Sequence, residues 1–202
     1  MKLMILGGFL GSGKTTFLLQ LARYLSGRTA GENRIIIVEN EVGEVSIDDK
    51  ILASQGYRIE TMFSGCACCT IRGQVEFAIR DIIRDYNPEY ILFEASGVAC
   101  PASIRENLRE RLGIDSRICT LVDAKRWPAL AKGARPFLES QLQGADVVLV
   151  NKIDRITGDM LEQVKTSLRE FGVTCRMLCL SAGSPIEPSV LAQILGEEES
   201  FL

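Results

Sequence analysis

The feature that most constrains the fold is a glycine-rich segment near the N-terminus, residues 8–15, with the sequence GFLGSGKT. It matches the phosphate-binding pattern GxxxxGK[ST] at every fixed position. It also follows the apolar run 3–6 and leads into a segment of helical spacing, 14–25. In that context, backbone N–H groups of the loop and the N-terminus of the helix can surround a phosphate. The alternative, a glycine-rich turn with a chance lysine, does not explain this order of strand, loop and helix.

The loop supplies specific candidate ligands for a nucleoside triphosphate. We expect Lys14 to reach the β- and γ-phosphate oxygens and the Thr15 hydroxyl to coordinate Mg²⁺. The glycines allow the backbone to turn tightly, so that consecutive N–H groups can point at the β-phosphate. The other nucleotide-binding residues predicted here are Gly8, Gly11, Ser12, Gly13 and Thr16.

Strand-like and helix-like segments alternate along the chain. Short apolar runs predict strands at 3–6, 35–38, 90–93, 118–122, 146–150 and 176–180. Helical spacing is found at 14–25, 74–86, 101–111, 159–171 and 188–197. This alternation predicts an α/β fold of the P-loop NTPase type, with a mostly parallel sheet and helices on both faces, in one domain over 1–202. Residues 45–62 are predicted as a strand or hairpin, and 124–145 as irregular because Pro128 and Pro136 interrupt it.

Composition excludes several classes of partner and site. The chain of 202 residues has a net charge of −3, which gives no reason to expect a nucleic acid or an anionic membrane as partner. The N-terminal apolar run leads straight into the phosphate loop, so we expect a cytoplasmic protein rather than a secreted one. The sequence contains no histidine, so any metal must bind thiolates, carboxylates, backbone groups or water.

A second motif, residues 90–97 with the sequence YILFEASG, has the pattern of an acidic residue at a strand end. A P-loop needs such a residue on a neighbouring strand to hold the metal and its water, and Glu94 is the candidate. Gly97 follows three residues later, where its N–H could contact the γ-phosphate. Taken alone, Glu94 could equally cap the next segment. We predict Lys14, Glu94 and Gly97 as the catalytic group.

A third motif ends the apolar run 147–150 with NKID at residues 151–154. Guanine presents N1–H and an exocyclic amino group as paired donors, and a carboxylate such as Asp154 accepts both, which adenine cannot match. We expect Asn151 to tie this loop to the P-loop and the Lys152 stem to stack along the base. The backbone around Ser181 and Ala182 is predicted to contact the guanine oxygen. The order of the three motifs favours GTP over ATP.

Three of the seven cysteines, Cys66, Cys68 and Cys69, lie within four consecutive positions. Neighbouring thiolates of this kind suit Zn²⁺ or another borderline metal better than a disulfide framework. An open fourth position could be filled by Glu41, Glu44, water or a partner protein. The alternative is that these cysteines are small buried apolar side chains.

These motifs together resemble the CobW/HypB/UreG family of GTPases, specifically its CobW-type branch. The matching segments, in the family order, are GGFLGSGKTT at 7–16, ENEVGEVSID at 39–48, GCACCTIRG at 65–73, FEASGVACP at 93–101 and NKID at 151–154. The resemblance implies a P-loop GTPase that delivers or inserts metals, usually zinc, cobalt or nickel, or acts as a gatekeeper for metalloenzymes. It also implies that Glu39 or Glu41 senses or shares the Mg²⁺.

Two features depart from that branch. Its members commonly carry a C-terminal domain and often a histidine-rich stretch, whereas this chain ends shortly after the GTPase core and has no histidine. We therefore expect a nucleotide-binding domain without the C-terminal domain. The aspartate that usually precedes proline in the acidic-strand motif is Cys100 here, which we interpret as a neutral substitution rather than an extra soft ligand.

The resulting hypothesis is a GTP-driven switch that couples nucleotide state to Zn²⁺ or Co²⁺ binding at the cysteine motif. The partner would be a client metalloprotein or a protein of a cofactor pathway. No catalytic base or arginine finger is apparent, so we expect slow hydrolysis that a homodimer or a client accelerates. The main alternative is a GTP-gated regulator or reactivator of a metalloenzyme or corrinoid protein, with a structural or redox cysteine site. A small-molecule kinase is a third possibility, which NKID and the cysteines disfavour.

Overall fold

A computed structural model describes residues 1–29, 34–39, 58–61 and 71–197 of the chain. Its centre is a seven-stranded sheet in the order β3-β2-β4-β1-β5-β6-β7, and every pair of neighbouring strands is parallel. The strands are β1 (Lys2–Gly8), β2 (Ile35–Glu39), β3 (Arg58–Thr61), β4 (Tyr90–Glu94), β5 (Ser116–Asp123), β6 (Val147–Asn151) and β7 (Arg176–Cys179).

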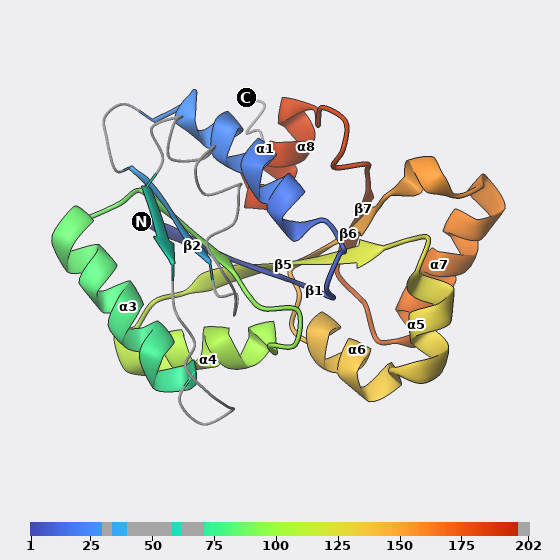
Figure 1. The fold of residues 1–202 in the computed structure, drawn as a ribbon, viewed down its shortest axis with the longest axis horizontal. Coiled ribbons are helices and arrows are strands. Elements are labelled where there is room, and N and C mark those ends of the chain that lie inside the picture. The colour runs from blue at the N-terminus through green and yellow to red at the C-terminus, as the bar shows by residue number, and fades with distance from the viewer. Residues whose placement is uncertain (30–33, 40–57, 62–70, 198–202) are drawn as a thin grey trace.

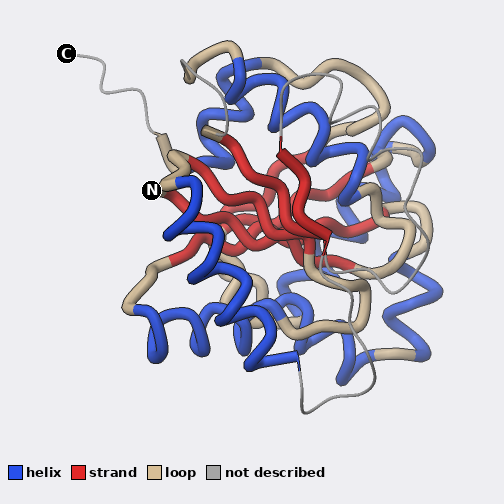
Figure 2. The backbone as a smooth tube through the Cα atoms, turned by 60° about the vertical axis from the view of Figure 1, so that its left-hand side comes forward, coloured by secondary structure: helices blue, strands red, loops and turns tan. Residues whose placement is uncertain are grey.

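Helices cover both faces of this sheet, as Figures 1 and 2 show. They are α1 (Lys14–Ser26), α3 (Ile71–Tyr86), α4 (Pro101–Leu112), α5 (Trp127–Gly133), α6 (Arg135–Leu142), α7 (Gly158–Glu170), α8 (Pro188–Leu195) and the 3₁₀ helix η1 (Ile153–Arg155). The predicted α/β class, with a parallel sheet between two layers of helices, is therefore confirmed.

The alternation of side chains along β1 explains why its sequence is continuously apolar. Met4 and Leu6 pack with α1 and α8 on one face, whereas Leu3 and Ile5 pack with α3 and α4 on the other. Successive side chains of a strand point to opposite faces, so a strand covered on both faces has no polar positions in its centre. Further along the sheet, α5, α6 and α7 cover one face of β5 and β6.

The segment 124–145 contains two helices, so the prediction that it is irregular was wrong. Pro128 lies in the first turn of α5 and Pro136 in the first turn of α6. The first-turn N–H groups of a helix have no intrahelical partner, and proline's fixed φ already suits a helix, so proline starts these helices instead of breaking them. A proline in the sequence indicates an interruption or a helix start equally well, and only the position of the first turn distinguishes the two.

Of the predicted strand or hairpin at 45–62, residues 58–61 belong to the part of the chain that the structure describes. These form β3, which pairs in parallel with β2 and therefore does not form a hairpin with it. In the described part of the chain, no helix is both long and apolar enough to cross a membrane.

The strand order fixes where a ligand can bind. The connection that leaves β1 leads to β2 on one side of it, and the connection that leaves β5 leads to β6 on the other side. In open parallel sheets, ligands bind beyond the carboxyl ends of the strands, at the point where the connections diverge. The ends of β1, β4, β5 and β6 thus enclose the expected site.

The α1 face makes the core sensitive to truncation. Phe17 is fully buried between α1 and the sheet, whereas Phe77 of α3 is 60% exposed. We expect Phe17→Ala to lower the free energy of unfolding by about 3–5 kcal/mol, because it leaves a cavity. Phe77→Ala, a matched truncation at the surface, should cost below about 1 kcal/mol. Urea unfolding followed by circular dichroism measures both, and equal losses would contradict this packing.

Candidate functional site

The loop between β1 and α1 depends on glycines at two close approaches. Gly8 has φ +132° and Gly13 has φ +101°, in the region that side chains rarely adopt. A Cβ at Gly13 would lie 2.4 Å from Asn151 Nδ2, and one at Gly8 would lie 2.4 Å from Leu121 O. The loop is therefore pressed against the ends of β5 and β6, and no other residue type fits at these positions.

At the phosphate end, Lys14, Thr15 and Glu94 lie together. Lys14 Nζ donates to Gly8 O at 3.2 Å and lies 4.0 Å from Glu94 Oε1. The Thr15 hydroxyl donates to the same Glu94 oxygen at 3.1 Å. The Lys14 and Glu94 side chains are each 3% exposed, so their opposite charges compensate in a buried setting.

The chemistry of this end fits a phosphate and a hard cation. The buried Ser12 Oγ has no hydrogen-bond partner among the residues that the structure describes, although buried hydroxyls normally have one. Thr15 and Glu94 offer only oxygen ligands, which are the ligands that Mg²⁺ prefers. The residues predicted to hold Mg²⁺ are thus adjacent, and their role remains a prediction.

Two further predicted residues lie beside this end. Glu39 ends β2 directly in register with Glu94 on β4, so both carboxylates occupy the same edge of the sheet. A Cβ at Gly97 would lie 2.9 Å from the Leu10 backbone nitrogen, so this glycine packs closely on the P-loop. The predicted contact of its N–H with a γ-phosphate is not tested.

At the other end of the loop, Asn151 is the central contact. Its Nδ2 donates to Ser12 O at 2.8 Å, and its Oδ1 accepts from the backbone nitrogens of Lys152 and Ala182, each at 2.8 Å. Asn151 is 1% exposed. One buried amide therefore joins the phosphate loop, the NKID loop and the segment after β7.

Asp154 lies next to this junction and keeps its negative charge. The Ser181 hydroxyl donates to Asp154 Oδ1 at 2.5 Å, and this hydrogen bond holds the pKa of Asp154 below its ordinary value. Since the pKa is lowered, the carboxylate is ionised throughout the neutral range. The Asp154 side chain is 55% exposed, with Oδ1 held by Ser181 and Oδ2 3.7 Å from Arg155, so a ligand can reach the carboxylate from solvent.

A cavity of ≈ 140 Å³ opens between these loops. Its lining is Gly13, Thr16, Asn151, Lys152, Asp154, Arg155, Ala182 and Gly183. The structure thus brings the start of α1 and four predicted residues of the base site, Asn151, Lys152, Asp154 and Ala182, to one cavity. The fifth, Ser181, is not part of the lining but donates to Asp154. Arg155 was not predicted; it lies 3.7 Å from Asp154 in an exposed ion pair.

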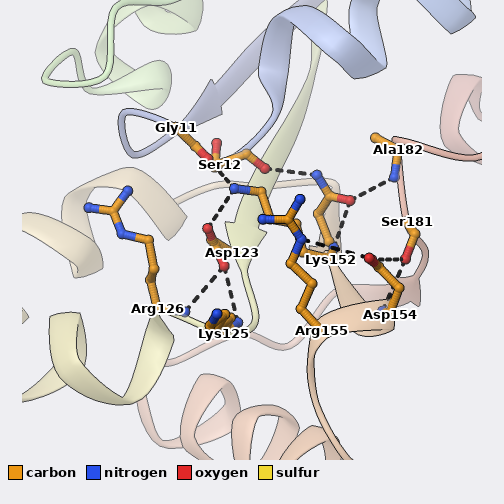
Figure 3. A network of polar contacts seen from close by, with 11 residues as sticks. Gly11, Ser12, Asp123, Lys125, Arg126, Lys152, Asp154, Arg155, Ser181 and Ala182 are labelled. Atoms are coloured by element: carbon orange, nitrogen blue, oxygen red, sulfur yellow. Dashed lines mark hydrogen bonds and ion pairs between the residues drawn. The ribbon is translucent and has the colours of Figure 1, made fainter.

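Sequence reasoning missed two groups at this site. Asp123, at the end of β5, is buried and forms an ion pair of 2.7 Å with Lys152 Nζ (Figure 3). Gln141 of α6 is also buried, and its Oε1 accepts from the Gly8 backbone nitrogen at 3.0 Å. Asp123 directly follows the apolar run 118–122, as Glu94 and Asn151 follow theirs. This position at a predicted strand end is the sequence signal that indicates a site residue.

The predicted transition-metal ligands Cys66, Cys68, Cys69 and Glu41 lie outside the described residues. Within the described part, the free cysteines are Cys100, Cys119, Cys175 and Cys179. Burial raises the pKa of the Cys119, Cys175 and Cys179 thiols. Cys100 Sγ donates to Ser140 O at 3.4 Å, and no group of three possible metal ligands occurs in that part of the chain.

The family model for the CobW/HypB/UreG nucleotide-binding domain matches residues 2–178, most of the chain. The chain belongs to the CobW/HypB/UreG family. The match begins with β1 and ends within β7, so it includes the phosphate loop, Glu94 and NKID of this nucleotide-binding domain.

Curated relatives agree with this membership. The zinc chaperone CobW of Pseudomonas aeruginosa is 30% identical over 204 residues, which cover 81% of this chain and 52% of the relative. The zinc chaperone YjiA of Escherichia coli is 32% identical over 161 residues, 74% of this chain and 48% of the relative. The chain spans about half the length of the curated relatives it matches.

Solved structures share the fold at low identity. Hydrogenase maturation factor HypB from Archaeoglobus fulgidus superposes with a TM-score of 0.71 and 16% identity, over 96% of this chain and 90% of that one. HypB from Helicobacter pylori, in complex with nickel, gives a TM-score of 0.62 and 18% identity, over 97% and 84%.

The close approach of Gly13 to Asn151 gives a direct test. Gly13→Ala should lower the free energy of unfolding by about 1–3 kcal/mol, because the methyl group strains the backbone and displaces the Asn151 amide. It should also weaken nucleotide binding. Gly158→Ala is the matched control, since a Cβ there meets nothing within 4 Å and φ is ordinary. Thermal denaturation with and without GDP measures both effects; equal behaviour of the variants would contradict the packing.

Proposed function

We propose that this domain binds GTP with Mg²⁺ and hydrolyses it to GDP and phosphate. The observation that carries the proposal is the buried Asn151 amide, which links the phosphate loop to the loop bearing Asp154. Through that link, a phosphate-binding segment and a carboxylate suited to guanine border a single cavity. One nucleotide can therefore contact both.

Asp154 supplies the preference for guanine. Its two oxygens accept from N1–H and the exocyclic amino group, whereas adenine lacks that pair of donors. The Ser181 hydroxyl fixes one oxygen and lowers the pKa, so the group is a pure acceptor at neutral pH. A site of this kind loses its hydrogen bonds when the wrong base enters.

At the phosphate end, Lys14 and the start of α1 bind the negative charge of the triphosphate. Lys14 Nζ, which donates to Gly8 O in this structure, can exchange that carbonyl for phosphate oxygens. The N-terminus of α1 also favours binding of an anion. Thr15 and Glu94 would hold Mg²⁺, which neutralises phosphate charge when bound. Glu39, beside Glu94, is proposed to take part in the same site.

The base site is tested by Asp154→Asn. An amide presents one donor and one acceptor in place of two acceptors, so it matches xanthine, whose C2 oxygen replaces the amino group of guanine. GTP affinity should fall about 100-fold or more, and the affinity for xanthosine triphosphate should rise. Isothermal titration calorimetry with both nucleotides measures this.

Asp159→Asn is the control for that experiment. Asp159 is an aspartate in the first turn of α7, outside the cavity lining. The Asp159→Asn variant should bind GTP with the affinity of the unmodified protein. If Asp154→Asn also keeps its GTP affinity, the assignment of the guanine site is wrong.

We further propose that the domain couples GTP to binding of Zn²⁺ or Co²⁺ at Cys66, Cys68 and Cys69, for delivery to a client metalloprotein. The relatives support a metal cargo, since they are zinc chaperones and a zinc-regulated GTPase metalloprotein activator from Dictyostelium discoideum. β3 ends at Thr61 in register with Glu39, at the phosphate edge of the sheet. Cys66 is five residues further along the chain, within ~17 Å of Thr61.

The metal proposal is tested with a Cys66→Ala/Cys68→Ala/Cys69→Ala variant. Loss of the three thiolates should weaken Co²⁺ binding by more than about 100-fold and remove the thiolate-to-cobalt charge-transfer absorption. The matched control is Cys175→Ala/Cys179→Ala, which removes two free cysteines outside the motif. This variant should keep the Co²⁺ affinity and the charge-transfer absorption of the unmodified protein.

Nucleotide dependence separates the two candidate roles of the cysteines. Delivery requires that Co²⁺ affinity differ between the GDP form and the form with a GTP analogue. A high Co²⁺ affinity that is the same in both nucleotide states would instead support a structural cysteine site in a GTP-gated regulator. A triple variant that binds Co²⁺ as tightly as the unmodified protein would end the metal proposal altogether.

A further inference from the structure

Three consecutive carbonyl groups of the phosphate loop are each held by a different side chain. Leu10 O accepts from Arg126 Nη1 at 2.9 Å, Gly11 O from Lys152 Nζ at 2.6 Å, and Ser12 O from Asn151 Nδ2 at 2.8 Å. Figure 3 shows Lys152 between Gly11 and Asp123. Each of these three carbonyls thus has its own side-chain donor.

This arrangement fixes the direction of the N–H groups. In a trans peptide the C=O of one residue and the N–H of the next point in opposite directions. The carbonyls of Leu10 and Ser12 point towards Arg126 and Asn151, so the N–H groups of Gly11 and Gly13 point away from those two side chains. The peptide between them, whose carbonyl Lys152 holds, directs the Ser12 N–H to Phe9 O at 3.0 Å, which closes the turn of the loop. N–H groups on one side of a glycine-rich loop are what binds a phosphate.

Asp123 organises two of the three donors. Its Oδ2 lies 2.7 Å from Lys152 Nζ. Its Oδ1 accepts from the backbone nitrogens of Lys125 at 3.1 Å and Arg126 at 3.2 Å, which sets the turn that leads into α5. The Asp123 side chain is 5% exposed and that of Lys152 is 25% exposed. This carboxylate is therefore well shielded and has a partner on each oxygen.

The ion pair has a clear physical consequence for Lys152. A lysine side chain has many rotamers, and holding it in one of them costs conformational entropy. The shielded carboxylate of Asp123 favours the single rotamer in which Nζ also reaches Gly11 O. Without the charge of Asp123, we expect hydration of the Lys152 ammonium group to be more favourable than its hydrogen bond to Gly11 O.

We propose that Asp123 is a positioning residue of the nucleotide site, which holds the phosphate loop ready for its ligand through Lys152 and Arg126. This inference rests on the proposed function, since it concerns the affinity of the same site for guanine nucleotides. Asp123 itself does not line the cavity beside Asp154. Its effect is preorganisation: a loop already in the binding conformation loses less free energy when the ligand binds.

The substitution Asp123→Asn isolates this effect. Asparagine keeps an oxygen that can accept from the Lys125 and Arg126 nitrogens, and its amide group replaces the charge that faces Lys152. We expect the affinities for GDP and GTP to fall together, by about tenfold, the size expected for losing a hydrogen bond to a charged group. At saturating GTP, kcat should stay within about twofold, because Lys14, Thr15 and Glu94 are untouched.

Asp146→Asn is a matched control at the opposite end of β6. Asp146 Oδ2 pairs with Arg105 Nη1 at 2.9 Å and accepts from the Ile118 nitrogen at 2.7 Å, so it combines an ion pair and a backbone hydrogen bond as Asp123 does. This variant should lower the melting temperature by a similar amount and bind GDP as the unmodified protein does. An equal loss of GDP affinity in both variants would mean that Asp123 acts only through general stability.

A double-mutant cycle with Lys152→Met tests the coupling itself. If Asp123 acts through Lys152, the double variant binds GDP no more weakly than the weaker single variant. Losses that multiply would overturn the proposal, as would an Asp123→Asn protein that binds GDP within about twofold of the unmodified one. Should Asp123→Asn fail to fold, Lys152→Met removes the same ion pair, and unchanged GDP affinity in that variant would overturn the proposal.

The outcome separates this inference from the proposed function. The unmodified protein is titrated first with GDP and Mg²⁺. Absence of guanine-nucleotide binding there would overturn both the proposed function and this inference. Binding by the unmodified protein and by Asp123→Asn with equal affinity would leave GTP binding standing and remove only the role of Asp123.

Discussion

The site depends on one buried side chain, the amide of Asn151. Its nitrogen binds the Ser12 carbonyl and its oxygen binds the nitrogens of Lys152 and Ala182, so that three loops distant in sequence are held at fixed separation. A nucleotide needs its phosphate and base sites at a constant distance, and a buried amide bonded through both its nitrogen and its oxygen provides this because breaking those hydrogen bonds is costly. Gly13 has no Cβ because this amide occupies that space.

The parallel sheet makes that contact possible. Polar residues end the two strands on each side of β1: Glu39 on β2, Glu94 on β4, Asp123 on β5 and Asn151 on β6. Each follows an apolar run covered by helices on both faces, so the first residue beyond the core is also the first that can be polar. The phosphate loop after β1 lies among these ends, and charges of opposite sign meet there as Lys14 with Glu94 and Lys152 with Asp123. The phosphate end and the base end of the site are thus both built from polar residues at the carboxyl ends of buried parallel strands.

Much of this was predictable from sequence, because the motifs have fixed spacing and depend on local backbone geometry. The strands, the phosphate loop, Glu94 and the tie between Asn151 and the loop follow directly from such patterns. Asp123 and Arg126 were missed because their role depends on contacts with Lys152 and Leu10, which lie far away in sequence. The helices α5 and α6 were missed because Pro128 and Pro136 were judged without knowing where each helix begins. Long-range pairing and helix boundaries are set by tertiary packing, which a single sequence does not reveal.

The central claim is that one guanine nucleotide contacts both the loop before Lys14 and Asp154. Two-dimensional NMR of the amides during titration with GDP and Mg²⁺ tests it most directly. The account predicts that the amide signals of Gly13 and Asp154 shift along the same saturation curve, and that pyrophosphate shifts the first but not the second. GDP that leaves the Asp154 amide unmoved, or that saturates the two signals at different concentrations, would contradict the account.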